Sequence, residues 1–309
     1  MTDFDDNNLP PPQDASNLTA PESPGEPPAA VPLTGDPFSL AAQAPRPVFR
    51  HRRNLPEDIR VSWSWAHFVV FIIFAIGSFI LVQTALAIHY APHRHLTQKQ
   101  LEEYLLSKPQ FLIGSNVLWD AAIFLFLYVT IGVLRGLPFW SALGWKKLKS
   151  NLAGGKRSPW AFFLSGCGLA ILVFIASARV HGTDNMPIQE ILKNRNSAML
   201  LMAMAVLIAP LVEETVFRGY LYPLFAKTFG ILPAIVVTGV LFGLMHGAQL
   251  GWTWGIVVLL ILVGIVFTMA RAYTGTVLAS FLLHLGYNSM IAAATIIGTR
   301  GFTQIPVGH

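Results

Sequence analysis

From about residue 62 onward, the chain consists largely of apolar runs of roughly twenty residues. A helix of that length rises about 30 Å at 1.5 Å per residue, which matches the thickness of the hydrocarbon core of a bilayer. Hydrophobic residues make up 53% of the 309 residues and charged residues only 12%, too few to cover the surface of an ordinary soluble enzyme. The runs therefore predict an all-α, polytopic transmembrane helix bundle.

Seven apolar segments predict about seven spans, all helical because lipid offers no partner for unpaired backbone groups. The segments cover about 65–88, 111–134, 160–178, 199–226, 231–249, 253–271 and 276–298. Residues 1–58 hold twelve of the 21 prolines among polar residues, a composition that buries too little apolar surface to fold. We therefore expect a disordered, Pro-rich acidic tail at 1–58 and a membrane-embedded domain at 59–309.

Basic residues close to the predicted spans indicate the orientation of the chain. Five arginines precede the first span (Arg46, Arg50, Arg52, Arg53 and Arg60), and six basic residues with no acid lie between the second and third spans (Arg135, Lys146, Lys147, Lys149, Lys156 and Arg157). Two crossings place both groups on one side, which the positive-inside rule assigns to the cytoplasm, together with the N-terminus. Since the basic excess is juxtamembrane, it points to lipid and predicts no nucleic-acid partner.

The fourth predicted span carries the densest set of ionisable residues, Glu213, Glu214 and Arg218. Each such group costs about 2.5–3.5 kcal/mol in a bilayer, so each requires a structural or chemical reason. Glu214 and Arg218 are four residues apart and can pair on one helix face. Glu213 points about 100° away and has no sequence-local cation, which suits it to accept and return a proton.

Two later spans carry polar side chains that lipid would also reject. The fifth holds Phe242 and His246 beside a stripe of Gly239, Gly243 and Gly247, and the seventh holds His284 and Asn288 on one face. Glu213 and His246 lie equally far from a turn at 229–230, so an antiparallel hairpin places them at one depth. Counting residues along the seventh span in the same way places His284 about 6 Å from the depth that Glu213 and His246 share.

Such a cluster supports acyl transfer to water. A carboxylate and an imidazole can bind and deprotonate a water molecule, while a second imidazole and an amide donate hydrogen bonds to the developing oxyanion. Asp120 is the only aspartate within the predicted spans. For it we expect a structural or snorkelling role near the outer end of the second span.

Three motifs occur in order on successive apolar segments: E-E-x-x-x-R at 213–218, F-x-x-x-H at 242–246 and H-x-x-x-N at 284–288. In this combination the chain resembles the CAAX protease and bacteriocin-processing enzyme (CPBP) family of intramembrane proteases, bacterial relatives of the Ras-converting CAAX prenyl endopeptidase. The resemblance covers residues 199–298, about a third of the chain. It implies an intramembrane endopeptidase acting on a membrane-anchored peptide or protein, in the inner membrane of a cell.

The resemblance also implies roles for individual residues. Glu213 and His246 would activate the water, and His284 and Asn288 would form the oxyanion hole. Glu214, Arg218 and Phe242 would support the site. The family is often called a metalloprotease, and Glu213, His246 and His284 are possible ligands of a divalent metal such as zinc. None of them belongs to an H-x-x-x-H pair on one helix, so the local spacing favours a metal-free mechanism.

Two other classes of function compete with the protease. In one, the protein is a non-catalytic scaffold that holds partner proteins in the membrane, with the polar cluster kept for packing. In the other, it is a transporter that relays protons, although no internal repeat supports this. The sequence contains no signal that sets the oligomeric state.

Overall fold

The computed structural model describes residues 56–92, 96–148, 158–180 and 194–302. Within these ranges the regular structure is helical and contains no strand, which confirms the predicted all-α class. Most of the predicted disordered tail, residues 1–55, lies outside the described residues. At its boundary, Glu57–Ile59 forms a short 3-10 helix, η1.

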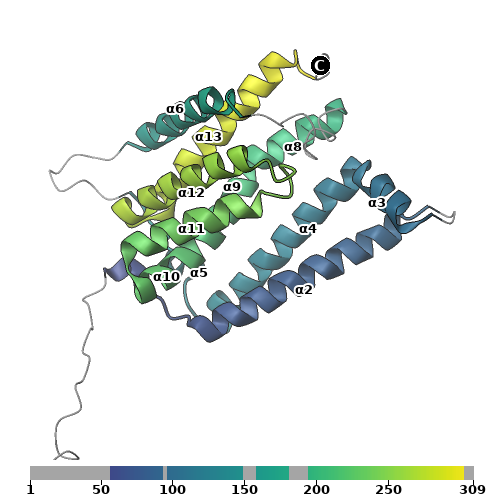
Figure 1. Ribbon diagram of the computed structural model, residues 1–309. Helices are drawn as coiled ribbons and strands as arrows, with labels where there is room; N and C mark the ends of the chain where they lie inside the picture. Colours follow the sequence, from purple (N-terminus) through teal and green to yellow (C-terminus); the bar gives the residue numbers. More distant parts are fainter. Residues whose placement is uncertain (1–55, 93–95, 149–157, 181–193, 303–309) are drawn as a thin grey trace, which may run out of the picture. The chain divides into compact units, whose positions relative to one another are not determined.

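The helices follow the predicted apolar segments closely (Figure 1). In chain order they are α2 (Trp65–Tyr90), α3 (Gln98–Leu106), α4 (Pro109–Leu127) with the π-helix η2 (Tyr128–Val133), α5 (Phe139–Ala142), α6 (Pro159–Ser177), α8 (Arg195–Leu207), α9 (Ala209–Glu214), the π-helix η3 (Thr215–Leu221), α10 (Tyr222–Phe229), α11 (Ile231–Met245), α12 (Trp254–Thr274) and α13 (Val277–Gly298). All seven predicted spans are therefore helical.

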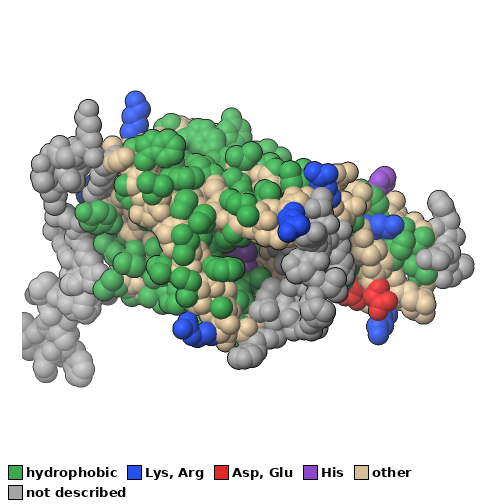
Figure 2. Space-filling view, turned by 90° about the horizontal axis from the view of Figure 1, so that it is seen from above, with side chains coloured by type: hydrophobic (Ala, Val, Ile, Leu, Met, Phe, Trp, Pro, Cys, Tyr) green, Lys and Arg blue, Asp and Glu red, His purple; other side chains and the backbone are tan. Residues whose placement is uncertain are grey.

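Six helical runs in the described residues are long and apolar enough to cross a membrane. They are Trp65–Tyr90, Pro109–Val133, Pro159–Ser177, Arg195–Phe229, Trp254–Thr274 and Val277–Gly298. The fifth predicted span is shorter than expected, because α11 ends at Met245 and not near residue 249. Hydrophobic side chains cover much of the surface seen in Figure 2, as a multi-pass membrane protein requires.

The fourth predicted span is interrupted, which the hydropathy pattern did not indicate. Helix α8 ends at Leu207, and α9 begins with Pro210 in its first turn. Proline has no backbone N–H and disfavours helical geometry in the residue before it, so the helix breaks here. After α9, the backbone widens into η3, which contains Arg218. π-Helical turns of this kind occur frequently at functional sites.

Helices α6 and α13 lie side by side (Figure 1) and touch through glycine. A Cβ atom on Gly166 would overlap the carbonyl oxygen of Leu283, and one on Gly286 would overlap that of Phe163. The two backbones are thus in direct contact, as small residues permit between membrane helices. This contact fixes α13, the helix that carries His284 and Asn288.

The predicted glycine stripe of α11 brings α12 equally close. A Cβ atom on Gly239 or Gly243 would lie 2.7 Å from the backbone nitrogen of Ile265 or Ile261. Gly247 lies beyond the end of α11 and faces the Trp252 ring instead. Two of the three glycines therefore set the distance between α11 and α12.

We predict that Gly166→Ala destabilises the bundle by about 1–3 kcal/mol, because the added methyl group overlaps backbone atoms that cannot rotate away. The measurement is the free energy of unfolding in detergent micelles.

The matched control is Gly168→Ala on the same helix, where a Cβ atom would meet nothing within 4 Å. This variant should be neutral or more stable, since alanine favours helix over glycine by up to about 1 kcal/mol. Equal destabilisation by both substitutions would contradict the backbone contact.

Candidate active site

A buried ion pair joins Glu214 at the end of α9 to Arg218 in η3. The guanidinium Nη1 donates to Glu214 Oε1 at 2.8 Å, and neither side chain is exposed. The i,i+4 pairing predicted from the sequence is therefore present. Removing two charges from solvent is expensive, and it is tolerated only where the remaining donors also find partners.

Helix α12 supplies those partners for Arg218. Nη2 donates to the carbonyl oxygen of Gly264 at 2.9 Å, and Nε donates to the hydroxyl of Thr268 at 3.3 Å. The Thr268 hydroxyl donates in turn to Gly264 O at 2.7 Å. The guanidinium carbon lies 4.5 Å from the centre of the Phe242 ring, in a cation–π contact.

Sequence reasoning missed Gly264 and Thr268. The available signal was their spacing of four residues, which places a small residue and a hydroxyl on one face of an otherwise apolar span. That signal is weak, because such pairs also occur at ordinary contacts between membrane helices.

His284 on α13 is tied to the ion pair. Its Nδ1 lies 3.0 Å from Glu214 Oε1, so the Nδ1–H donates to the carboxylate. The ring is buried and lies 4.6 Å from the Phe267 ring, centre to centre. Because Nδ1 is committed, Nε2 is the nitrogen left facing Glu213, 3.8 Å from Oε2. His284 therefore reaches Glu213, despite the difference in depth of about 6 Å expected from the sequence.

His246 approaches Glu213 from α11. It is the residue that caps the C-terminal end of this helix, and not a residue inside the helix as the sequence predicted. Its Nδ1 donates to the carbonyl oxygen of Phe242 at 2.8 Å. Its Nε2 lies 3.9 Å from Glu213 Oε1, which agrees with the common depth expected from the hairpin.

The Glu213 carboxylate therefore lies between two imidazole Nε2 atoms. Its side chain and that of His246 are 24% and 23% exposed, whereas Glu214 and Arg218 are completely buried. Glu213 Oε2 has no hydrogen-bond partner among the described residues. The cluster thus has a closed side, where charges are neutralised, and an open side, where a carboxylate and an imidazole remain available.

The two other predicted residues have different surroundings. Phe242 lies at the centre of the cluster, with its ring 4.9 Å from that of His246 and 5.7 Å from that of His284. Asn288 turns toward α8, where Nδ2 donates to the carbonyl oxygen of Ala205 at 2.7 Å. Asn288 shares the helix face of His284, one turn further along, but no hydrogen bond joins it to the other predicted residues in the described part of the chain.

The predicted metal ligands do not form a ready metal site. Among the described residues, no group of three or more His, Cys, Asp or Glu side chains is arranged to hold an ion. His246 and His284 direct Nε2 toward opposite oxygens of Glu213, at 3.9 and 3.8 Å.

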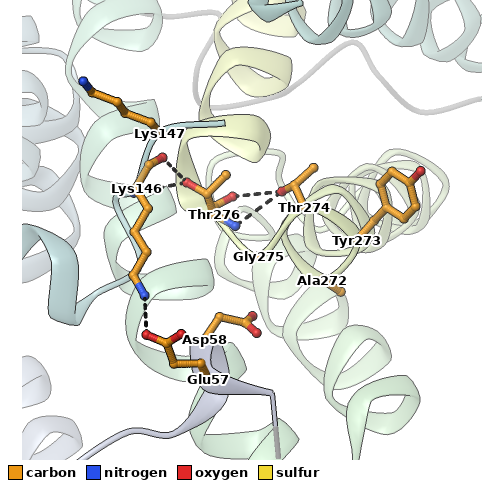
Figure 3. Close-up of a pocket in the computed structure, with 9 residues that line it drawn as sticks. All are labelled: Glu57, Asp58, Lys146, Lys147, Ala272, Tyr273, Thr274, Gly275 and Thr276. Carbon is orange, nitrogen blue, oxygen red and sulfur yellow. Dashed lines mark hydrogen bonds and ion pairs between the residues drawn. The ribbon is translucent and has the colours of Figure 1, made fainter. Parts of the chain in front are cut away.

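A separate pocket of about 310 Å³ lies outside this cluster (Figure 3). It is lined by Glu57, Asp58, Lys146, Lys147 and residues 272–276. Lys146 Nζ lies 3.7 Å from Glu57 Oε1, and the Thr276 hydroxyl donates to Lys146 O at 2.6 Å. Next to the pocket, buried Arg271 on α12 donates to Asp58 Oδ2 at 2.7 Å. These contacts anchor the segment before α2 to the end of the bundle.

Fold and site together define a multi-pass helical membrane protein in which a neutralised Glu–Arg–His network supports a partly exposed Glu–His pair. Residues 195–290 match the family model described as "Type II CAAX prenyl endopeptidase Rce1-like", which confirms the resemblance read from the three motifs. The match indicates a membrane-embedded protease. Comparisons with curated proteins and with solved structures gave no match.

We predict that Arg218→Met destabilises the protein by about 3–5 kcal/mol, because it leaves the Glu214 charge buried without a partner. The double variant Glu214→Gln/Arg218→Met should recover part of this loss, since both charges are then absent. The measurement is again the free energy of unfolding in micelles.

Arg195→Met provides the control, because Arg195 is exposed at the start of α8. It should change stability by no more than about 0.5 kcal/mol. A double variant as unstable as Arg218→Met alone would show that the charges are not energetically coupled.

Proposed function

We propose that this protein is an intramembrane endopeptidase that hydrolyses a peptide bond of a membrane-anchored peptide or protein. One observation carries the proposal: the Glu213 carboxylate lies between the Nε2 atoms of His246 and His284, on the open side of an otherwise neutralised cluster. The family match over residues 195–290 supports the same class of reaction.

Glu213 and His246 activate the attacking water. Their separation of 3.9 Å is too long for a direct hydrogen bond and suits one bridging water molecule. Because the Nδ1–H of His246 is held by Phe242 O, Nε2 is free to accept a hydrogen bond from that water. Glu213 takes the proton as the water attacks the scissile carbonyl carbon, and returns it to the leaving amine.

His284 and Asn288 stabilise the oxyanion of the tetrahedral intermediate. Because Nδ1 of His284 is held by Glu214 Oε1, the ring directs Nε2 toward Glu213 and the developing oxyanion. The amide of Asn288 uses one hydrogen for Ala205 O and offers the second. Arg218 and Phe242 hold Glu214 and the two imidazoles in place.

The surroundings of the reaction follow from the same proposal. The substrate reaches the site from the bilayer, and the protein resides in the inner membrane with its N-terminus in the cytoplasm. The scaffold alternative explains the Glu214–Arg218–His284 network as packing. It does not explain Glu213, whose side chain is 24% exposed and whose carboxylate lies between the Nε2 atoms of His246 and His284.

We predict that Glu213→Gln lowers peptide hydrolysis by a factor of about 10² to 10⁴, because the amide cannot accept the proton of water. Folding should be preserved, since glutamine has nearly the same shape. The measurement is fragment release from membrane-anchored peptides by the full-length protein in proteoliposomes, read by mass spectrometry.

The control is Glu102→Gln, which removes an equal charge from an exposed position on α3. It should leave hydrolysis unchanged. If the wild-type protein retains partner proteins but cleaves nothing, or if Glu213→Gln cleaves as fast as wild type, the scaffold class is favoured instead.

A further prediction separates two roles of Asn288. If it belongs to the oxyanion hole, Asn288→Ala lowers kcat by a factor of about 10² to 10³ with KM nearly unchanged. If it only joins α13 to α8 through Ala205 O, the variant loses about 1 kcal/mol of stability and keeps its kcat. Steady-state kinetics and unfolding of the same preparation distinguish these results, and we expect the first.

A further inference from the structure

The π-helix η3 is held at both ends by indole N–H groups from distant parts of the chain. At its first residue, Trp145 Nε1 donates to the hydroxyl of Thr215 at 3.1 Å. At its last residue but one, Trp63 Nε1 donates to the carbonyl oxygen of Tyr220, also at 3.1 Å. Trp63 lies ahead of α2 and Trp145 follows α5, so both lie outside the residues 195–290 that match the family model. The turn is therefore fixed from outside the segment that carries the three motifs.

Tyr220 is fixed by its side chain as well as by its backbone. The residue is completely buried, and its hydroxyl lies 2.8 Å from His67 Nδ1 on α2, within hydrogen-bond distance. Its ring stacks on that of Trp63 at 5.4 Å and lies 4.9 Å from that of Phe71, centre to centre. These contacts leave the end of η3 little freedom to rotate.

The backbone of η3 also packs directly on the loop that carries Trp145. A Cβ atom on Gly219 would lie 2.9 Å from the carbonyl oxygen of Leu143. Leu143 is completely buried, and the Trp145 ring packs on that of Phe281 on α13, with the ring centres 5.3 Å apart. The loop is thus itself held by the bundle and can fix the position of η3.

The form of η3 determines the direction of Glu213, which lies just before it. A π-helical turn contains one residue more than an α-helical turn, and each residue rotates a helix by about 100°. If η3 relaxed to an α-helix, the residues of α9 would rotate by about this angle relative to those that follow η3. Glu213 would then leave its place between the Nε2 atoms of His246 and His284, which lie 3.9 and 3.8 Å from its carboxylate. Because π-helices are rare, the surrounding contacts must stabilise this form.

We propose that Trp63 and Trp145 are positioning residues, whose indole N–H groups hold η3 in the π-helical form that directs Glu213 between the two imidazoles of the site. The inference rests on the proposed function, since it concerns the carboxylate that activates the water. Both tryptophans act through η3 and not on the reacting atoms.

The test compares Trp63→Phe and Trp145→Phe with wild type, each as the full-length protein in proteoliposomes. Phenylalanine keeps an aromatic ring at each position and removes the N–H donor. In each variant kcat should fall about tenfold, because a small displacement of the base is costly to proton transfer. KM should change by less than about twofold, since only the placement of the base differs. Should one variant not fold, the other tests the same turn from its opposite end.

Trp65→Phe is the matched control, because Trp65 also donates its indole N–H to a later helix. Its partner is the hydroxyl of Thr228 on α10, at 3.0 Å and outside η3. This variant should keep the wild-type kcat. An equal loss of kcat in all three variants overturns the inference, because it would reflect a general loss of packing. A wild-type kcat in both test variants overturns it as well.

A spectroscopic measurement separates this inference from the proposed function. In protein with isotope-labelled histidine, the NMR resonances of His246 and His284 Nε2 should respond to the nearby carboxylate, so Glu213→Gln should shift both. The two test variants should shift them in the same direction, and the control should not. Unchanged resonances in both test variants overturn the positioning role. If the resonances move as expected while Glu213→Gln hydrolyses peptides as fast as wild type, the proposed function fails and the placement of Glu213 by the tryptophans stands.

Discussion

The ion pair between Glu214 and Arg218 is the interaction on which the rest of the site depends. Both side chains are completely buried, and the guanidinium is held at the same time by Gly264 O and the Thr268 hydroxyl of α12. Glu214 in turn accepts from His284 of α13. One pair of charges therefore fixes three separate helices relative to one another inside an environment that would otherwise reject it.

This arrangement divides the polar residues by their surroundings. On the closed side, every charge has a partner, and aromatic rings exclude solvent from Arg218. On the open side, Glu213 and His246 are about a quarter exposed. The reactive carboxylate is therefore both rigid and accessible. Glu214 and Arg218 hold the helices together, whereas Glu213 and His246 face the substrate.

Much of this could be predicted from the sequence, because membrane spans are set by apolar length and the helical repeat fixes which residues share a face. Those two rules gave the helices, the Glu214–Arg218 pair and the approach of His246 to Glu213. They passed over the break at Pro210, although a proline is itself a local signal that ends a helix. They could not give the π-helical turn or the partners of Arg218 on α12. These depend on backbone carbonyls and on the rotation of neighbouring helices, which no single segment encodes.

The contact between Asp58 and Arg271 has a consequence for the order in which the molecule assembles. Arg271 is buried at the end of α12, and its partner lies 213 residues earlier in the chain, ahead of the first span. During synthesis, the flank that carries Asp58 is made long before the helix it docks against. This flank therefore stays unpaired while the earlier spans enter the bilayer, and the contact between Asp58 and Arg271 forms at a late stage of folding.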